Sequence, residues 1–235
     1  MTAPAGLGFL FDVDNTLIDN DAAQADYRAH LERESGREAA DRYWAIFLEH
    51  RRQIGYADYL GALQQYRLER LHDPSVILMS SFLLDYPFAD RLYPGALEVV
   101  ERCGRVGRTI VLSDGDVVFQ PRKIERAGIR RAVEDRVLVC VHKELELADV
   151  ERLYPADHYV LIDDKLRILT AVKRTWGSRV TTIFARQGHY AHDPDILAAY
   201  PPADHSIAHI GDLLHLDLVA LSGAPEVHGT PQETP

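Results

Sequence analysis

Two aspartates follow an apolar stretch near the start of this 235-residue chain. Residues 7–11 read Leu-Gly-Phe-Leu-Phe, a composition typical of a strand that is covered on both faces. Asp12 and Asp14 come next, and residues two apart in an extended chain project to the same side. Two carboxylates placed in this way repel each other unless one binds a proton or a cation lies between them. A hard cation that prefers oxygen ligands, such as Mg2+, suits that arrangement.

The same two aspartates also have a structural interpretation, because aspartates after strands commonly begin loops or cap helices. Three further groups of polar residues favour a site, since each group follows an apolar stretch of its own. The groups are Ser113-Asp114-Gly115-Asp116, His142-Lys143-Glu144 and Asp163-Asp164-Lys165. In open parallel sheets, ligands bind at the carboxyl ends of the strands. We therefore expect the four groups to gather at one edge of a sheet.

Apolar stretches and helical patterns alternate along the chain from residue 94 onward. Val-, Ile- and Leu-rich strands joined by helices predict a parallel sheet with right-handed crossovers. The fold class expected is α/β, a Rossmann-like parallel sheet core with helices on both faces. The expected strands are 109–112, 136–141, 158–162, 179–184 and 206–210, and the expected helices are 95–103, 122–127, 146–153, 166–176 and 212–221.

Residues 19–90 contain no convincing strand and instead carry apolar and aromatic residues at helical spacing. Segments 22–33, 39–52 and 56–71 show the pattern, and their aromatic residues are interpreted as the core of a small helix bundle rather than a substrate box. The predicted organisation is an α/β core of residues 1–18 and 91–222, an α-helical insertion of residues 19–90, and a disordered tail of residues 223–235.

Composition limits the partners that this chain is expected to have. The formal net charge is -10, which argues against binding to a nucleic acid polymer or to an anionic membrane surface. No apolar run approaches the length of a membrane span, and the N-terminus does not resemble a signal peptide. Cys103 and Cys140 lack metal-ligand spacing and are interpreted as buried thiols. We expect a cytoplasmic protein.

The motif Asp-Val-Asp-Asn-Thr-Leu at residues 12–17, together with the three later groups, resembles the four motifs of the haloacid dehalogenase-like (HAD) superfamily. The resemblance covers residues 7–18 and 94–186 and follows the order nucleophile, Ser or Thr, Lys and acidic pair. It implies that the protein is a phosphatase or a phosphotransferase. It also implies that residues 1–18 and 91–222 form the catalytic core and that residues 19–90 form a helical cap domain inserted after the first strand. The motifs are specific for the superfamily and not for a substrate.

The resemblance implies a catalytic role for Asp12, Asp14, Ser113 and Lys143. Asp12 would be the nucleophile that forms an aspartyl-phosphate, and Asp14 would protonate the leaving alcohol and then deprotonate the attacking water. Lys143 would neutralise the Asp12 carboxylate and the phosphate. The dehalogenase branch lacks the second aspartate, so Asp14 points towards phosphate chemistry.

Substrate phosphate binding is assigned by the resemblance to Ser113, Asp114, Gly115 and Lys143. Ser113 would contribute its hydroxyl, and its loop would contribute backbone N–H groups. Gly115 suits a loop that approaches a ligand closely. The carboxylates of Asp114 and Asp116 would repel an anion, so we expect them to point away or to cap a helix.

The metal site implied by the resemblance consists of Asp12, Asp163, Asp164 and the main-chain carbonyl of Asp14, with Mg2+ as the cofactor. Which of the two adjacent aspartates binds the ion directly stays open.

Lys123 competes with Lys143 for the cationic role. Lys143 is preferred because it follows an apolar strand, whereas Lys123 is interpreted as an exposed helical lysine. Glu144 departs from the family pattern, in which many members have proline directly after this lysine.

The function predicted is Mg2+-dependent hydrolysis of a small-molecule phosphate monoester through an aspartyl-phosphate. The partner would be a small phosphorylated metabolite. Alternatives are a phosphotransferase or phosphomutase of the same superfamily and a phosphate-binding regulatory protein without turnover; a dehalogenase is disfavoured by Asp14. Because specificity would lie in residues 19–90, the motifs do not identify the substrate, and the sequence does not give the oligomeric state.

Overall fold

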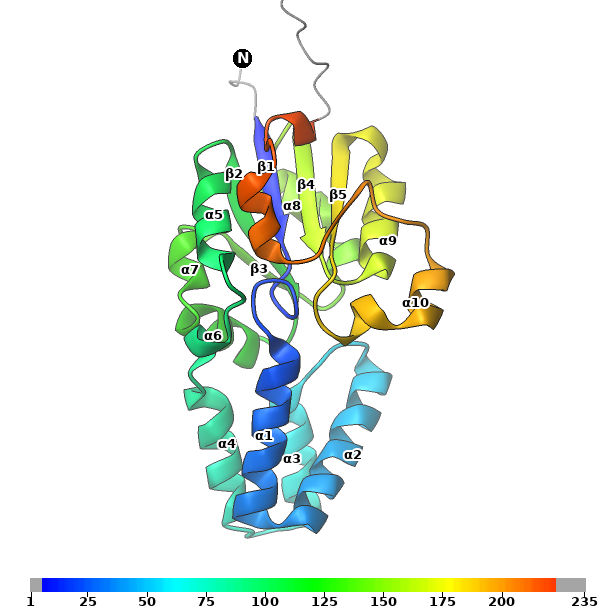
Figure 1. Ribbon diagram of the computed structural model, residues 1–235. Helices are drawn as coiled ribbons and strands as arrows, with labels where there is room; N and C mark the ends of the chain where they lie inside the picture. The colour runs from blue at the N-terminus through cyan, green and yellow to red at the C-terminus, as the bar shows by residue number, and fades with distance from the viewer. Residues whose placement is uncertain (1–5, 223–235) are drawn as a thin grey trace, which may run out of the picture.

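The core of the protein is a six-stranded sheet in the order β3-β2-β1-β4-β5-β6, and every neighbouring pair of strands is parallel (Figure 1). This computed structural model describes residues 6–222. The strands are β1 (Leu7–Phe11), β2 (Arg108–Asp114), β3 (Val137–Cys140), β4 (His158–Asp163), β5 (Val180–Ala185) and β6 (His205–Ile207).

The four central strands β2, β1, β4 and β5 are largely buried on both faces, which explains why they are apolar runs rather than alternating patterns. In β1, Phe9 and Phe11 belong to one hydrophobic core and Leu10 to a second. Helix α5 (Ala96–Gly104) contributes Val100 to the first core, whereas α9 (Leu166–Trp176) contributes Val172 to the second. Helices therefore cover both faces, and the predicted α/β class with a Rossmann-like parallel sheet is confirmed.

Short helices connect the remaining strands. They are α6 (Phe119–Arg126), α7 (Ile129–Ala132), α8 (Leu147–Leu153) and α10 (Pro194–Ala199), with 3-10 turns η2 (Lys143–Leu145), η3 (Gly177–Arg179) and η4 (His189–His192). The predicted helix 166–176 has the same bounds as α9, and the other strands and helices expected between residues 95 and 184 differ from the observed ones by a few residues at their ends.

Four helices pack together beyond the carboxyl edge of the sheet (Figure 1). They are α1 (Asn20–Ser35), α2 (Arg37–Ile54), α3 (Tyr59–Glu69) and α4 (Ser75–Asp85), followed by the 3-10 turn η1 (Phe88–Arg91). We call these four helices the helical group. Two of its boundaries follow local signals, because the Asp19 side chain accepts a hydrogen bond from the Ala22 N–H at the start of α1, and Gly55 ends α2 in the left-handed conformation.

Aromatic side chains form the interior of the helical group, as the sequence predicted. Tyr43 and Phe47 of α2 are buried, and Tyr43 meets Tyr27 of α1 edge to face with 5.2 Å between ring centroids. Phe47 stacks on Tyr59 of α3 at 4.6 Å. Such pairs add to the hydrophobic stabilisation of the helices they join.

The predicted helix 212–221 is wrong, and two 3-10 turns replace it: η5 (Ile210–His215) and η6 (Ala220–Ser222). The Arg102 side chain donates to the main-chain carbonyls of Leu213 and Leu216 at 2.7 and 2.9 Å, so these carbonyls bond to a neighbouring helix rather than to later residues of their own. The strand expected at 206–210 is shorter and lies at His205–Ile207. The predicted disordered tail lies outside the described residues.

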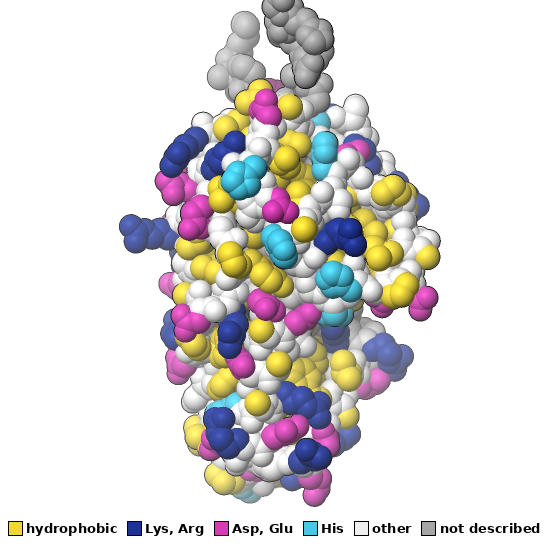
Figure 2. All heavy atoms as spheres, in the orientation of Figure 1, with side chains coloured by type: hydrophobic (Ala, Val, Ile, Leu, Met, Phe, Trp, Pro, Cys, Tyr) yellow, Lys and Arg dark blue, Asp and Glu magenta, His cyan; other side chains and the backbone are white. Residues whose placement is uncertain are grey.

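Charged side chains of both signs are interspersed on the face shown in Figure 2, over the helical group in particular. Within residues 6–222, none of the helices combines the length and the apolar character that crossing a bilayer requires.

Strand order places a crevice at the carboxyl ends of β1 and β4. The chain passes from β1 to β2 and β3 on one side, then returns to β4 on the other side of β1. Open α/β sheets bind their ligands at such a reversal of strand order.

Candidate active site

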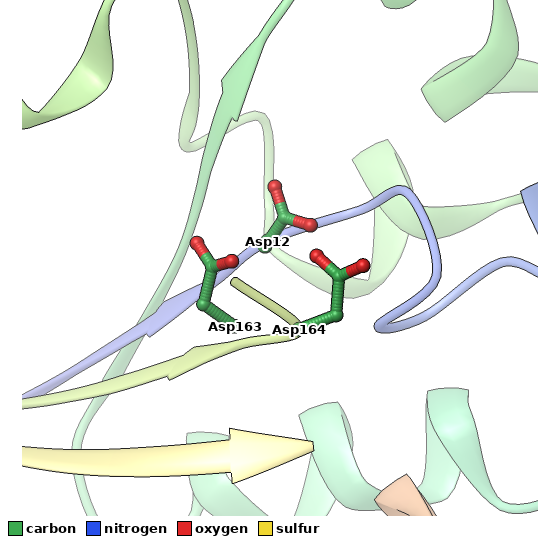
Figure 3. A group of neighbouring side chains, drawn as sticks. All are labelled: Asp12, Asp163 and Asp164. Atoms are coloured by element: carbon green, nitrogen blue, oxygen red, sulfur yellow. The ribbon is translucent and has the colours of Figure 1, made fainter. Parts of the chain in front are cut away.

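Three buried aspartates meet in this crevice. Asp12 follows β1, and its N–H donates to the Ile162 carbonyl of β4 at 3.0 Å, which brings it beside Asp163 and Asp164 at the end of β4. One carboxylate oxygen from each aspartate lies within 4.8 Å of the others. Figure 3 shows the three carboxylates pointing into a common space. The predicted meeting of the first and fourth polar groups is therefore observed.

Lys143 neutralises part of this negative charge. It begins η2 after β3 and is fully buried. Its Nζ donates to the Asp12 carboxylate and lies 2.6 Å from an Asp163 oxygen. Burial opposes its charge, but Asp12 and Asp163 outweigh that effect and raise the pKa of Lys143 well above its ordinary value. Lys143, rather than Lys123, thus occupies the predicted cationic position beside Asp12.

The three aspartates differ electrostatically although all are buried. Burial favours the neutral form of Asp12, but Lys143 and Lys165 outweigh it and lower the pKa of Asp12. Burial raises the pKa of Asp163, and raises that of Asp164 well above the ordinary value, with the nearby Asp12 carboxylate adding to the effect. Of these three aspartates, Asp12 is therefore the one whose pKa its surroundings lower.

The environment of the Asp164 carboxylate indicates whether a metal ion fits this site. Asp164 is 1% exposed, and neither carboxylate oxygen has a hydrogen-bond partner among residues 6–222. A buried carboxylate without partners is costly unless a cation or a proton compensates it. Three carboxylates and no histidine or thiol form a hard, all-oxygen donor set, which suits Mg2+. Among residues 6–222 this is the one group of His, Cys, Asp and Glu side chains able to hold a metal ion.

The second polar group lies at the end of the neighbouring strand β2. Ser113 is 1% exposed, and its Oγ accepts a hydrogen bond from the Gln120 amide of α6 at 2.9 Å. Gly115 leaves room for that contact, because a Cβ atom there would lie 2.6 Å from the Gln120 Cβ. The Ser113 loop is therefore held by the helix that follows it.

The two aspartates of this loop behave largely as expected. Asp116 accepts from the Val118 and Phe119 N–H groups and so caps the start of α6. Asp114 accepts from the Lys143 N–H at 2.7 Å, which joins the ends of β2 and β3. Burial raises the pKa of the Asp114 carboxyl.

Asp14 and Lys123 form a pair separate from the three aspartates. The Lys123 Nζ lies 2.7 Å from the Asp14 Oδ1, and the Asp14 carboxylate is not part of the group formed by Asp12, Asp163 and Asp164. The interpretation of Lys123 as an exposed helical lysine is wrong, because it is 0% exposed. Lysine is rarely buried unless it is paired, so the sequence alone favours an exposed position for a lysine on a helix.

Comparisons with known proteins decide the family. The haloacid dehalogenase-like hydrolase family matches residues 8–174. The chain belongs to the haloacid dehalogenase-like hydrolases. A crystal structure of a haloacid dehalogenase-like hydrolase from Burkholderia xenovorans LB400 shares 58% sequence identity, over 91% of this chain and 100% of that chain, with a TM-score of 0.88. The predicted superfamily is confirmed.

More distant haloacid dehalogenase-like structures share the fold. L-2-haloacid dehalogenase from Xanthobacter autotrophicus is 17% identical, over 89% of this chain and 97% of that chain, with a TM-score of 0.61. The HAD-hydrolase YfnB from Bacillus subtilis, bound to magnesium, is 15% identical over the same shares, with a TM-score of 0.59. A search of curated proteins returned no match.

A pocket of about 270 Å³ opens between the sheet edge and the helical group of this haloacid dehalogenase-like hydrolase. Its walls come from the ends of β1, β2 and β4, from α1, from the α2–α3 connection, and from residues 189–200. The polar lining residues are Asp14, Asn15, Asn20, Gln24, Arg51, Tyr56, Asp114, Asp164, Lys165, Arg167, His189, Tyr190 and Tyr200.

Lys165 is a pocket residue to which the sequence argument gave no role. Burial opposes its charge, but Asp164 and Asp12 outweigh that effect and raise the pKa of Lys165 above its ordinary value. Its position directly after the Asp163-Asp164 pair was an available signal, since a cation beside two buried carboxylates reduces their repulsion.

The loop after β5 also borders the pocket. His189 and Tyr190 line it, and the Asp21 carboxylate of α1 accepts from the His189 main-chain N–H at 2.8 Å. Gly188, at φ 70°, passes so close to Asn15 that a Cβ atom would lie 2.5 Å from the Asn15 side chain. The loop after β5 is therefore fastened to the segment that carries Asp14.

Proposed function

We propose that this protein is a Mg2+-dependent phosphatase that hydrolyses a phosphate monoester of a small metabolite through an aspartyl-phosphate. The buried group of Asp12, Asp163 and Asp164 supports this proposal best, because the partnerless Asp164 carboxylate provides for a cation beside an ionised Asp12. Those three residues would hold Mg2+. When bound, the ion would neutralise negative charge on the transferring phosphoryl group.

The reaction would take two steps. In the first, an Asp12 oxygen forms a bond to phosphorus, the ester P–O bond breaks, and the leaving oxygen takes a proton from Asp14. In the second, Asp14 takes a proton from a water whose oxygen attacks phosphorus, and the bond between phosphorus and Asp12 breaks. The products are inorganic phosphate and the free Asp12 carboxylate, and Asp14 again carries its proton.

Binding of the phosphoryl oxygens would use groups at the ends of β2 and β3. Lys143 contacts Asp12 directly, and the Ser113 hydroxyl lies at the end of the adjacent strand β2. The main-chain N–H groups of Asp114 and Gly115 would add donors from the same loop.

Residues 19–90 are proposed as a cap domain that selects the substrate. In support, the pocket is lined both by the core and by the helical group, through Gln24 and Arg51 among others. A cap at this place would exclude water until the leaving group has departed. A phosphotransferase would use the same first step and differ only in the acceptor of the second; a regulatory protein would bind phosphate without turnover.

Dehalogenation is the second candidate, since solved relatives of the same fold include L-2-haloacid dehalogenases. Asp14 argues against it for a chemical reason: halide is a stable leaving group that needs no proton, whereas an alkoxide does. The paired Asp163 and Asp164 also provide negative charge that an anionic haloacid would have to overcome without a cation.

The deciding experiment measures phosphate release from 4-nitrophenyl phosphate and chloride release from 2-chloropropionate, each with Mg2+ or with EDTA. Wild type should release phosphate with Mg2+ only, and Asp12→Asn should reduce that activity to background. Asp157→Asn serves as the control, because Asp157 precedes β4 at the opposite edge of the sheet and accepts from the Gly6 N–H. Phosphatase activity that survives Asp12→Asn, or chloride release independent of Mg2+, would contradict the proposal.

A further inference from the structure

Lys123 is a fully buried cation to which the reaction above assigns no role. It lies on α6 and is 0% exposed. Its Nζ donates to Asp14 at 2.7 Å and to the side-chain carbonyl of Asn20, the first residue of α1, at 3.0 Å. Burying an ammonium group is costly unless it is paired, and Asp14 is its carboxylate partner.

Two aromatic rings fix the position of the Lys123 ammonium. Its Nζ lies 5.2 Å from the ring centroid of Phe119 and 5.7 Å from that of Phe88. Both distances are within the range of cation–π attraction. With rings beside it and oxygen acceptors at its tip, the side chain has little freedom to move, so the oxygen it holds on Asp14 is fixed as well.

A second side chain on the same face of α6 holds another group of the site. Gln120 precedes Lys123 by three residues, a spacing that places both on one side of a helix. Gln120 is 3% exposed and donates to the Ser113 Oγ at 2.9 Å. One buried face of α6 thus contacts both the hydroxyl proposed to bind phosphate and the carboxylate proposed to move the proton.

We infer that Lys123 is a positioning residue for Asp14, and that α6 orients Asp14 and Ser113 together. This inference rests on the proposed phosphatase reaction. Lys123 contacts the Oδ1 atom of Asp14, which leaves the other oxygen to carry the proton and to give it to the leaving group. Without Lys123, Asp14 keeps its place on the backbone but its carboxylate rotates freely, and proton transfer to the leaving oxygen becomes less effective.

Leaving groups of different basicity separate this role from a merely structural one. The test compares 2,4-dinitrophenyl, 4-nitrophenyl and phenyl phosphate, because dinitrophenolate departs without a proton whereas phenolate needs one. Lys123→Met removes the charge and keeps the length of the side chain. We expect kcat/KM for phenyl phosphate to fall by about tenfold or more, out of the ~10²–10⁴ that a general acid contributes, and for 2,4-dinitrophenyl phosphate by less than about threefold.

A double-mutant cycle tests whether Lys123 acts through Asp14. Asp14→Asn alone should show the same selective loss with phenyl phosphate, and adding Lys123→Met to it should cause no further loss. Lys173→Met is the matched control, since the Lys173 Nζ donates to Asp204 at 2.8 Å and this pair does not line the pocket. Its activity should equal that of wild type with all three phosphates.

An equal loss with all three phosphates in Lys123→Met, or a further loss in the double variant, would overturn the positioning role. If Lys123→Met does not fold, as judged by circular dichroism, Lys123→Gln is measured in its place and should show a weaker selective loss. If Asp12→Asn hydrolyses phosphate esters as well as wild type does, the proposed phosphatase mechanism is wrong. If activity requires Asp12 but Lys123→Met loses it equally with all three phosphates, only the inference about Lys123 is wrong.

Discussion

At the scale of single residues, the pKa values of Asp12 and Asp164 shift in opposite directions although both side chains are equally buried. Lys143 donates to Asp12, and the pKa of Asp12 is lowered. Within the described part of the chain, no donor forms a hydrogen bond with the Asp164 oxygens, and burial raises the pKa of that carboxyl. A cation in the crevice would therefore gain most of its binding energy at Asp164, because it supplies a partner to buried oxygens that lack a hydrogen bond.

Asp164→Asn should abolish the stabilisation of the protein by Mg2+. Wild type in excess Mg2+, at about one hundred times its Kd, should gain about 2.7 kcal/mol over wild type in EDTA, because only the folded state binds the ion. For a chain of this length each kcal/mol raises Tm by about 2–4 °C. In EDTA the variant should be at least as stable as wild type, since a buried carboxyl group without hydrogen-bond partners is gone.

Thermal unfolding followed by circular dichroism, in EDTA and in MgCl2, measures both effects. Asp157→Asn is again the control and should keep the full response to Mg2+. An Asp164→Asn variant whose Tm rises with Mg2+ as much as that of wild type would show that the ion binds elsewhere.

At the scale of elements, the pocket depends on contacts between segments far apart in the sequence. Arg51, near the end of α2, donates to the Tyr190 hydroxyl of η4, and its guanidinium lies 5.9 Å from the centre of the Tyr190 ring. Lys165, after β4, lies 5.7 Å from the same ring. Tyr190 offers Arg51 a hydroxyl oxygen, and the ion pairs of residues 6–222 include no carboxylate bound to Arg51.

Arg51→Met should weaken binding of substrates whose leaving group carries a carboxylate. A hydrogen bond to a charged group contributes about 1.5–3 kcal/mol, so kcat/KM for 3-phosphoglycerate should fall by roughly 10- to 100-fold. The value for glycerol 3-phosphate, which lacks the carboxylate, should change by less than about threefold. The measurement is phosphate release as a function of substrate concentration.

Arg52→Met is the matched control, because the neighbouring Arg52 pairs with Glu49 on the surface and its side chain is 75% exposed. It should leave both substrates unaffected. Equal losses with both substrates in Arg51→Met would show that Arg51 maintains the α2–η4 contact rather than binding the leaving group.

At the scale of the whole molecule, two hydrophobic cores lie on opposite faces of one sheet, and each contains one cysteine. Cys103 belongs to the core shared with the helical group and Cys140 to the other. Both are free thiols and both are buried. Burial raises the pKa of each thiol to about 12. Because the thiolate is the reactive form, both cysteines should be inert while the fold is intact.

Titration with a thiol reagent at pH 8 should therefore give almost no fast reaction in the native protein and two thiols per chain in denaturant. The raised pKa of the two thiols also makes the stability of the protein depend on pH. Between the ordinary value near 9 and about 12, the folded state keeps the proton that the unfolded state releases. Raising the pH through that range should lower stability. Cys103→Ser and Cys140→Ser assign any fast-reacting thiol, and a full equivalent of fast reaction at pH 8 would contradict this account.

The sequence by itself determined the α/β fold, the order of the strands' polar ends and the gathering of Asp12, Ser113, Lys143 and Asp163 at one edge. Each of these depends on local information: apolar runs predict buried strands, and parallel strands place their carboxyl ends at the same edge in whatever order they pair. The motif residues directly follow those strands, so they could be identified without knowledge of any tertiary contact.

Only the tertiary structure decided which charged groups become partners. The spacing of Asp12 and Asp14 predicted neighbouring carboxylates, but in the structure Asp14 pairs with Lys123. The predicted grouping of Asp12 with Asp163 and Asp164 is observed. That choice depends on the packing of α6 against η1, where Phe88 and Phe119 enclose the lysine. Packing between elements selects the rotamer of each side chain and therefore the direction in which it points. The periodicity of residues along one helix or strand does not specify that rotamer.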